Sequence, residues 1–355
     1  SMIMNHESLI ATKARRVRTV APKDALMEFG LRRAQGHSAG LWGARAAMIG
    51  GFNGTSNVEA GKRFGIPVLG TMAHSWVMSF DEEIDAFREY VRQYHDNLIL
   101  LADTYNVLEM GVPHAIQVFK ELKEEGRLPG KYGIRIDSGD IAYLSQEATR
   151  MFTEAGFPDA IISGSNDLDE YTIQSLKAQG CTVTSWGVGT KIITADGTSA
   201  LGGVFKMAVK EADGKEVPVM KFSNDVEKMT NPGIKTVYRF YKKDTGKMIT
   251  DLVCLRDEKA ADGGDFTLVT ESAKWRRKEL KAGTYTVEEL LRPVVENGRN
   301  LPLPVLPEII RYADKQMDTL WPEYTRLLNP DLMEINLSDK LQTLKSELIR
   351  RELGE

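Results

Sequence analysis

Four apolar runs between residues 96 and 190 share one pattern, in which an apolar stretch ends in polar or glycine residues. They cover residues 96–106, 131–140, 158–167 and 181–190. An unbroken apolar run of this length is typical of a parallel strand that is buried on both faces. We therefore expect four consecutive strands of one parallel sheet.

Amphipathic stretches fill the intervals between these runs. Residues 141–156 place their apolar positions on one face and end at Gly156. Residues 167–180 begin at Asp167, which we expect as the N-cap, and end at Gly180. Strands and helices of these lengths in alternation predict βα units.

A further strand and helix are predicted ahead of these units. The apolar run "GIPVLG" (65–70) has the pattern of a buried strand. The stretch "SFDE" (79–82) fits a capping box at the start of a helix. The stripe of that helix would consist of Ile84, Phe87, Val91 and Tyr94.

Parallel strands with polar carboxyl ends occur both in α/β barrels and in doubly wound sheets. In either architecture the functional site collects at that edge of the sheet. The residues expected there are Asp103, Asp137, Ser138, Gly139, Gly164, Ser165, Gly187 and Gly189. His74 follows the 65–70 run and belongs to the same edge.

The last third of the chain predicts different elements. Residues 235–258 predict a β-hairpin whose turn is "KDTGK". Residues 337–353 predict an amphipathic helix with Ser338 as its cap.

Composition narrows the class of protein. The chain has 355 residues, 42% of them hydrophobic and 27% charged, which suits a large core plus a smaller domain. A net charge of -4 gives no basic surface for nucleic acid. No apolar run reaches about 18 residues, so no membrane span is expected. The first residues lack the order of a signal peptide, and we expect a cytoplasmic protein.

The strand ends carry candidate chemistry for a phosphorylated sugar. Glycines in "SGSND" (163–167) and "WGVGTK" (186–191) let backbone N–H groups approach an anion, as in a phosphate cradle, although such glycines also serve as turns. Arg135 supplies a cation, and Asp137 can accept from a ribose diol or hold a metal. An internal ion pair that closes the strand end is the alternative.

Six motifs in fixed order resemble the nicotinate phosphoribosyltransferase family. They are "EFGLRRAQG" (28–36), "GGFNGTSNVEAGKRFGIPVLGTMAHSW" (50–76), "LADTYN" (101–106), "RIDSGD" (135–140), "WGVGT" (186–190) and "KFSNDVEKMTNPGIKTVYRF" (221–240). The resemblance implies an irregular TIM-like α/β barrel over residues 1–215, of which the first ~15 form a helical lead-in. The remainder of a second, smaller α/β domain would cover residues 216–355.

The resemblance also implies a reaction. Nicotinate and phosphoribosyl pyrophosphate give nicotinate mononucleotide and pyrophosphate, with Mg²⁺ as cofactor and ATP as co-substrate, in NAD salvage. His74 matches the histidine that ATP phosphorylates, and Asp103 matches the carboxylate that orients its ring. A structural, hydrogen-bonded histidine is the alternative for His74.

The sugar and its phosphates have matching residues as well. Arg135 and Asp137 match the residues that hold the sugar phosphate and the ribose hydroxyls. The remaining residues implied for this part of the site are Ser138, Gly139, Gly164, Ser165, Gly187, Gly189 and Thr190. The sequence contains no dedicated metal cage, which suits a Mg²⁺ held largely by the substrate.

For the base, Phe29 and Arg32 resemble the family's stacking and cation pair. The related nicotinamide enzymes carry an aspartate where this chain has Ser56. A carboxylate there would accept from an amide and repel nicotinate, so Ser56 favours nicotinate.

Two rival interpretations stay open. The family has a further N-terminal segment that completes the partner subunit's pocket in a homodimer, and we expect this chain to be a fragment that lacks it. The chain is then either an active nicotinate phosphoribosyltransferase or a catalytically impaired fragment or structural relative. Such a relative would only bind phosphoribosyl ligands or pair with a full-length subunit. Quinolinate phosphoribosyltransferase shares the barrel type, but it needs no ATP-reactive histidine, and His74 argues against it.

Overall fold

The computed structural model divides by its contacts into two units. The structure describes the whole chain except residues 224–227, 261–263, 271–272 and 355. The first unit comprises residues 1–202 and 306–310, and the second comprises residues 203–305 and 311–355. The domain boundary expected after residue 215 stays a prediction.

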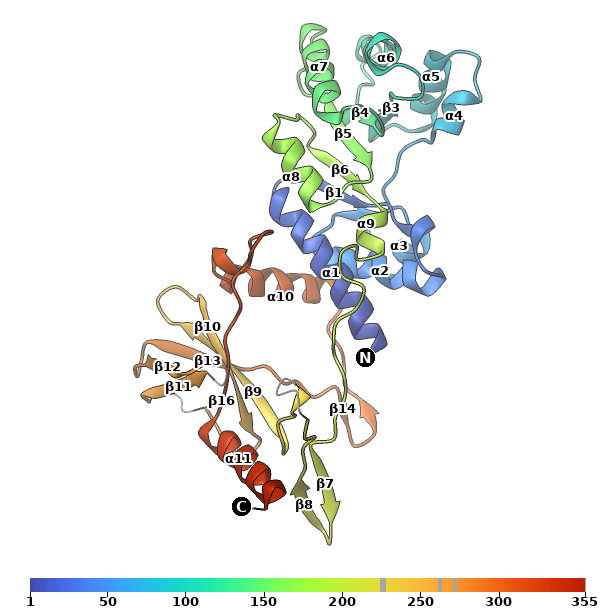
Figure 1. Cartoon of the computed structure of the whole chain (residues 1–355). Helices are drawn as coiled ribbons and strands as arrows, with labels where there is room; N and C mark the ends of the chain where they lie inside the picture. The colour runs from blue at the N-terminus through green and yellow to red at the C-terminus, as the bar shows by residue number, and fades with distance from the viewer. Residues whose placement is uncertain (224–227, 261–263, 271–272, 355) are drawn as a thin grey trace. The chain divides into compact units, whose positions relative to one another are not determined.

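The first unit is built around a curved, wholly parallel sheet that forms a half-barrel (Figure 1). Its strands in spatial order are β2 (Gly54–Thr55), β1 (Ala25–Glu28), β6 (Ser185–Val188), β5 (Ile161–Asn166), β4 (Tyr132–Ile136) and β3 (Leu98–Leu101). Every pairing between neighbours is parallel, so all six carboxyl ends lie at one edge. The four strands expected from the apolar runs are confirmed as β3 to β6.

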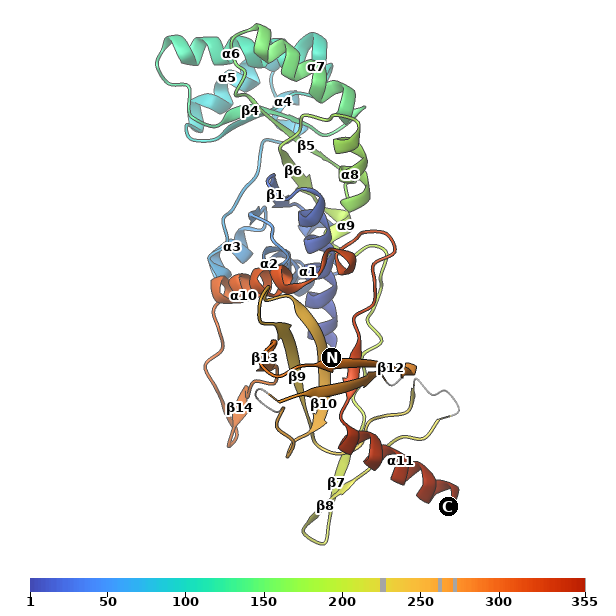
Figure 2. The same ribbon diagram turned by 90° about the vertical axis from the view of Figure 1, so that its left-hand side faces the viewer.

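Helices connect these strands. They are α1 (Met2–Val20), α2 (His37–Ile49), α3 (Val58–Phe64), α4 (His74–Met78), α5 (Glu83–Gln93), α6 (Val112–Glu124), α7 (Ile141–Glu154), α8 (Glu170–Ala178) and α9 (Thr190–Ile193), with a 3₁₀ turn at Leu31–Arg33 and a π-helical turn at Val107–Gly111. Helices α5, α6 and α7 follow one another beside β3 and β4 in Figure 1, and Figure 2 shows the same helices near β4 after a quarter turn. The helices expected between the last three strands are thus confirmed as α7 and α8.

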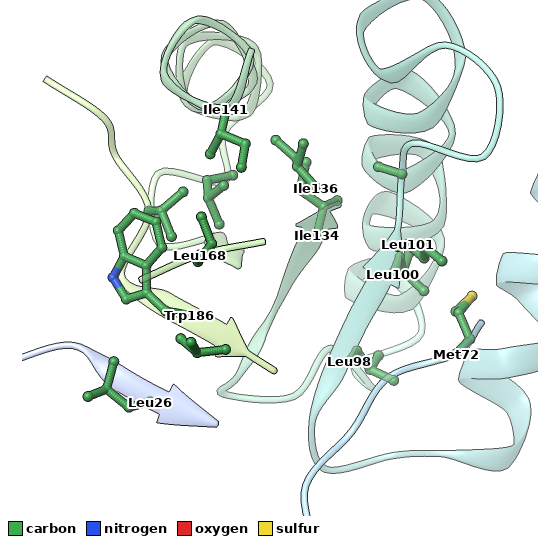
Figure 3. Packing of buried hydrophobic residues seen from close by; sticks show 14 of the residues in the cluster. Leu26, Met72, Leu98, Leu100, Leu101, Ile134, Ile136, Ile141, Leu168 and Trp186 are labelled. Carbon is green, nitrogen blue, oxygen red and sulfur yellow. The ribbon is translucent and has the colours of Figure 1, made fainter. Parts of the chain in front are cut away.

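The core of the first unit lies between the sheet and these helices. Strands β1, β3, β4 and β6 contribute Leu26, Leu98, Ile134 and Trp186 to this core, and α7 contributes Ile141 (Figure 3). All four residues of β3 are buried, as the unbroken apolar run predicts. Burial on both faces rigidifies the edge from which the site residues emerge.

The strand expected at 65–70 is wrong. That segment makes a single isolated bridge, from Val68 to Thr55, and two backbone hydrogen bonds flank it. Pro67 has no N–H to donate to a ladder, and Val68 is half exposed, so the run neither pairs nor buries as a strand does.

Two predicted helix starts are also wrong. Ser79 ends α4, where its hydroxyl donates to the carbonyl of Trp76, and α5 begins after Glu82 without a side-chain cap. Tyr94 lies just past that helix and is exposed. Helix α8 is capped by Asp169, which accepts from Thr172 N at 2.8 Å, because a short turn after β5 takes up Asp167.

The second unit contains a mixed sheet. Its strands in spatial order are β12 (Ala273–Leu280), β11 (Phe266–Thr270), β16 (Ile335–Leu337), β10 (Met248–Leu255), β9 (Lys235–Lys242) and β13 (Tyr285–Glu289). Only β10 and β16 pair in parallel among the described strands of this sheet. Two small hairpins accompany it, β7 (Val209–Ala212) with β8 (Lys215–Pro218) and β14 (Val295–Glu296) with β15 (Arg299–Asn300).

The hairpin and the helix expected near the C-terminus are confirmed. Strands β9 and β10 are antiparallel neighbours joined by the predicted turn. Helix α11 (Asp339–Leu353) begins at Ser338, whose hydroxyl accepts from Leu341 N. Further helical elements in the described part of the chain are α10 (Leu306–Thr319) and a 3₁₀ turn at Pro322–Tyr324.

Two further findings concern the thiols and the helices of the chain. Cys181 and Cys254 are free thiols, and burial raises the pKa of Cys254 to about 12. Among the described residues, no helix combines the length and the apolar character that crossing a membrane requires.

Candidate functional site

The carboxyl edge of the parallel sheet surrounds a pocket of about 770 Å³, which we call the site pocket. Ten of the residues singled out from the sequence line it. They are Phe29, Arg32, Ser56, His74, Arg135, Asp137, Ser165, Gly187, Gly189 and Thr190. The ends of five strands, β1, β2, β4, β5 and β6, therefore contribute to one concave surface, and His74 joins them from the start of α4.

His74 stands at the wall of the site pocket on the first turn of α4. Its Nε2 lies 3.0 Å from Oδ1 of Asp103, which follows β3. The imidazole is 40% exposed, whereas the carboxyl group is buried. In a neutral imidazole this contact assigns the proton to Nε2, which donates to the carboxylate, and leaves the lone pair on Nδ1.

Asp103 connects this histidine to the end of the next strand. Its Oδ2 accepts from the backbone N–H of Asp137 at 2.9 Å and from the hydroxyl of Ser138 at 2.6 Å. The carboxylate therefore holds the imidazole and the β4 end in one rigid arrangement.

Arg135 is the centre of a second group of polar contacts. Nε donates to the hydroxyl of Ser165 at 2.7 Å, and one terminal nitrogen donates to the hydroxyl of Thr71 at 2.8 Å. The other terminal nitrogen lies 3.0 Å from Oδ1 of Asp137, which also accepts from Ser165. Each nitrogen of the guanidinium thus has its own partner, and the cation is fixed at the pocket wall.

Phe29 lies across the glycine of β6. A Cβ at Gly187 would come within 2.7 Å of the Phe29 ring, so only glycine fits beneath it. The guanidinium carbon of Arg135 lies 5.9 Å from the ring centroid, within reach of a cation–π interaction. The ring therefore joins the β1 side of the pocket to the β4 side.

Four predicted residues do not line the pocket. Asp103 and Ser138 stand behind His74 and Asp137, where they act through hydrogen bonds. Gly139 is the left-handed residue that precedes the α7 cap. Gly164 directs its Cβ position toward Val183 and Trp186 in the core.

Sequence reasoning missed other members of the pocket wall. Arg33, Thr71, Asn166 and Asp167 line it as well. Asn166 has a φ of 134°, a backbone conformation that favours glycine, and its side chain accepts from Asp167 N. Nothing in the sequence marks that backbone strain, whereas Thr71 carries a signal in its place three residues before His74.

Two buried carboxyl groups lie near this edge outside the predicted set. Burial raises the pKa of Glu28, and hydrogen bonds from Thr55 and Gly30 oppose that rise. Burial likewise raises the pKa of Glu83, against hydrogen bonding from His114. Both groups carry an electrostatic cost that a neutral side chain would avoid.

No protein metal cage is present in the part of the chain that the structure describes, because no three His, Cys, Asp or Glu side chains gather there. Asp137 is the carboxylate of the pocket wall that could ligate a metal ion, and it already forms an ion pair with Arg135. These residues fit a Mg²⁺ bound mainly through substrate oxygens.

The second unit holds a cavity of similar volume, about 780 Å³. It is lined by lysines such as Lys242 and Lys278 and by Trp321, over whose ring Lys242 lies. None of the predicted site residues belongs to it, so the candidate chemistry is confined to the first unit.

Family models match this chain along most of its length. The nicotinate phosphoribosyltransferase (NAPRTase) family model matches residues 25–260, and the nicotinate phosphoribosyltransferase C-terminal domain model matches residues 234–345. The nicotinate phosphoribosyltransferase of Bacillus subtilis (strain 168) is 41% identical over 351 residues, which are 98% of this chain and 70% of the relative. The human nicotinate phosphoribosyltransferase is 31% identical and matches 98% of this chain and 73% of its own length.

Solved structures agree with the sequence matches. Human nicotinic acid phosphoribosyltransferase superposes with a TM-score of 0.81 at 30% identity, over 97% of this chain and 74% of the human chain. Nicotinate-nucleotide pyrophosphorylase from Pyrococcus furiosus superposes with a TM-score of 0.67 at 22% identity, over 89% and 71% of the two chains, and shows a likeness of fold. This chain belongs to the nicotinate phosphoribosyltransferase family.

Proposed function

We propose that the chain transfers the phosphoribosyl group of phosphoribosyl pyrophosphate to nicotinate, with ATP hydrolysis coupled through a phosphohistidine at His74. The pyridine nitrogen attacks C1′, the bond from C1′ to the pyrophosphate oxygen breaks, and pyrophosphate leaves. Family membership supports the reaction class. The observation that carries the proposal is the His74–Asp103 pair at the wall of a pocket that also holds Arg135 and Phe29.

His74 acts as the nucleophile toward the γ-phosphoryl group of ATP. Asp103 accepts a hydrogen bond from Nε2, with Nε2 and Oδ1 3.0 Å apart. This bond orients the neutral ring and keeps its lone pair on Nδ1. Nδ1 forms the bond to phosphorus, and the bond from phosphorus to the ADP oxygen breaks. Water later hydrolyses the phosphohistidine and restores the imidazole.

Arg135 and its partners receive the phosphoribosyl group. The guanidinium presents positive charge fixed by Ser165, Thr71 and Asp137, and it needs no reorganisation when a phosphate arrives. Backbone donors after β5 and β6, around Ser165 and Gly189, form the proposed cradle for the 5′-phosphate. Mg²⁺ supplies neutralisation of the pyrophosphate charge, and Asp137 is the residue of this wall that would share in holding it.

Phe29, Arg32 and Ser56 form the proposed nicotinate side. The aromatic ring offers a stacking surface, and Arg32 offers a cation for the carboxylate of nicotinate. Ser56 leaves that carboxylate unopposed, whereas an aspartate would repel it.

The finer features of fold and assembly belong to the same proposal. We propose that the half-barrel is the main part of an irregular TIM-like barrel, that the protein works as a homodimer in the cytoplasm, and that its domains meet after residue 215. The alternative is a relative that binds phosphoribosyl ligands without turnover.

Incubation with γ-labelled ATP and Mg²⁺ tests the proposal, followed by product analysis with nicotinate and phosphoribosyl pyrophosphate. Acid-labile, base-stable label on the wild type but not on His74→Ala, together with nicotinate mononucleotide formation, supports it. Tight binding of phosphoribosyl pyrophosphate without label or product supports the alternative instead.

A further inference from the structure

We propose that Glu28 is a positioning residue that fixes the β1 and β2 ends of the site pocket and so sets the affinity for nicotinate. The inference rests on the proposed function for its choice of substrate. Glu28 does not line the pocket, and it acts through residues that do. The resemblance that identified Phe29 and Arg32 assigned it no role.

The carboxyl group of Glu28 is enclosed and is shared between two segments. The residue is completely buried at the end of β1. One oxygen accepts from the backbone N–H of Gly30, and the other accepts from the hydroxyl of Thr55 at 2.6 Å. One side chain therefore joins the turn after β1 to the end of β2.

The first of these contacts fixes the turn that carries two arginines. Gly30 caps the 3₁₀ turn Leu31–Arg33, and its carbonyl accepts from Arg33 N at 2.8 Å. A Cβ at Gly30 would lie 2.5 Å from Ile193 Cβ and 2.8 Å from the Glu28 oxygen. The glycine thus lets the carboxyl group reach the amide, and that bond sets where Arg32 and Arg33 enter the pocket.

The second contact fixes the segment that carries Ser56. Thr55 Oγ1 donates to Glu28 and accepts from Asn57 N at 3.0 Å. Asn57 in turn caps α3 through Ala60 N, and Ser56 N donates to the carbonyl of Glu28 at 3.0 Å. Ser56 is consequently held on both sides by groups that depend on Glu28.

The contacts of the Glu28 carboxyl group differ from those of a buried ion pair, because they come from neutral donors. Both donors to the Glu28 carboxyl group in the described part of the chain are neutral, an amide and a hydroxyl. Burial accordingly raises the pKa of the group. A methionine would fill the volume without the cost of a buried ionisable group, but it has no two acceptors at fixed spacing. The carboxyl group therefore serves to hold the turn after β1 and the end of β2 at a fixed distance from each other.

The test compares Glu28→Gln with Asp24→Asn as its matched control. Asp24 is a mostly buried carboxyl group at the opposite end of β1, where it accepts from Lys177 and Trp186. Both changes replace a carboxyl group by its amide, one at each end of β1. Hydrogen exchange of residues 29–34 and 54–58 is measured, together with the KM for nicotinate and the KM for phosphoribosyl pyrophosphate.

Glu28→Gln should accelerate exchange in both segments and raise the KM for nicotinate, each about tenfold, equivalent to about 1.4 kcal/mol. The KM for phosphoribosyl pyrophosphate should stay within about twofold, because Arg135 and its partners do not touch Glu28. Asp24→Asn should do neither. Unchanged exchange in both segments, or an equal rise of both KM values, would overturn the proposal.

Thr55 provides a second route in case Glu28→Gln fails to fold. Thr55→Val removes the hydroxyl donor at nearly constant volume. It should accelerate hydrogen exchange in residues 54–58 and raise the KM for nicotinate, as Glu28→Gln does. Thr55→Ser keeps the donor and should behave like the wild type. Identical Val and Ser variants would contradict the role of this hydrogen bond. If the wild type makes no nicotinate mononucleotide, the proposed function fails, while the exchange measurements still decide whether Glu28 positions these segments.

Discussion

The two ends of the site pocket are held in different ways. At the end formed by β3, β4 and β5, polar and charged side chains bind one another directly. Asp103 binds His74, and Arg135 binds Asp137. At the end formed by β1 and β2, the pocket residues Arg32 and Ser56 depend on a backbone fixed from behind by Glu28. The rate of the reaction should therefore depend on individual side chains at the first end. The affinity for nicotinate should depend on the position of the backbone at the second end.

The first end should show the largest effect of any substitution. His74→Ala removes the proposed nucleophile, so labelling by γ-labelled ATP should fall to background. Asp103→Asn keeps the size of the orienting group but loses its charge, and it should lower the labelling rate about 10–100-fold. The two rates are measured as acid-labile phosphate against time.

Equal labelling of His74→Ala and wild type would contradict the nucleophile assignment. Thermal unfolding of both variants provides the control, because His74 is partly exposed and its removal should leave stability close to that of the wild type.

Arg135→Lys should have the next largest effect. Lysine keeps the charge but cannot meet Ser165, Thr71 and Asp137 at once, so the fixed fork is lost. We expect kcat/KM for phosphoribosyl pyrophosphate to fall about 100-fold, from the loss of hydrogen bonds to a charged group. Steady-state kinetics at saturating nicotinate measure it, and a change below about twofold would show that the fork is not needed.

Ser56→Asp tests the second end through charge. The new carboxylate would face the carboxylate of nicotinate, and the preference for nicotinate over nicotinamide should shrink about tenfold. Ser56→Asn is the control, since it adds similar bulk without charge. Competition between the two bases measures the preference, and equal effects of Asp and Asn would assign the change to size.

Gly187→Ala tests the shape of the same end and should have a smaller effect. The added Cβ would lie 2.7 Å from the Phe29 ring and displace it, which should raise the KM for nicotinate about threefold. Gly164→Ala is the matched control on the neighbouring strand, because its Cβ would meet Val183 in the core. That variant should lose about 1 kcal/mol of stability and keep the KM for nicotinate.

Much of the first unit could be predicted from sequence because its strands are buried on both faces. The runs that form β3 and β4 are apolar at successive positions, as is typical of parallel strands buried on both faces. The polar residues after them mark the carboxyl edge of the sheet. The run at 65–70 misled for a physical reason: apolar content alone does not reveal that Pro67 withholds a donor and that the segment pairs at one bridge only.

The candidate site shows the same division. Asp137 could be found by its position after a strand, and His74 by its motif, although the strand expected ahead of His74 does not form. Glu28 could not, because it ends a strand and its carboxyl group turns inward, where only the fold brings Thr55 within 2.6 Å. The roles of all of these residues stay predictions until the substitutions are made.

The smallest expected effect concerns pH and again separates the two ends. Burial raises the pKa of Glu28 above its ordinary value of 4.5. Below pH 4.5 the group is protonated in the folded and unfolded states, and as pH rises the unfolded state releases its proton first. The free energy of unfolding of the wild type should therefore fall from pH 4.5 until pH passes the raised pKa, and Glu28→Gln should lack this decline.

Glu89→Gln is the control of opposite sign for this measurement. Arg92 lowers the pKa of the Glu89 carboxyl group to about 2, so its contribution to stability is complete above pH 4.5 and is lost as pH falls toward 2. Urea unfolding between about pH 2 and 8, in the same buffers for all three proteins, covers both titrations and gives the profiles. If wild type and Glu28→Gln run parallel, the carboxyl group titrates alike in both states, and the buried acid that distinguishes the β1 and β2 end has no energetic consequence there.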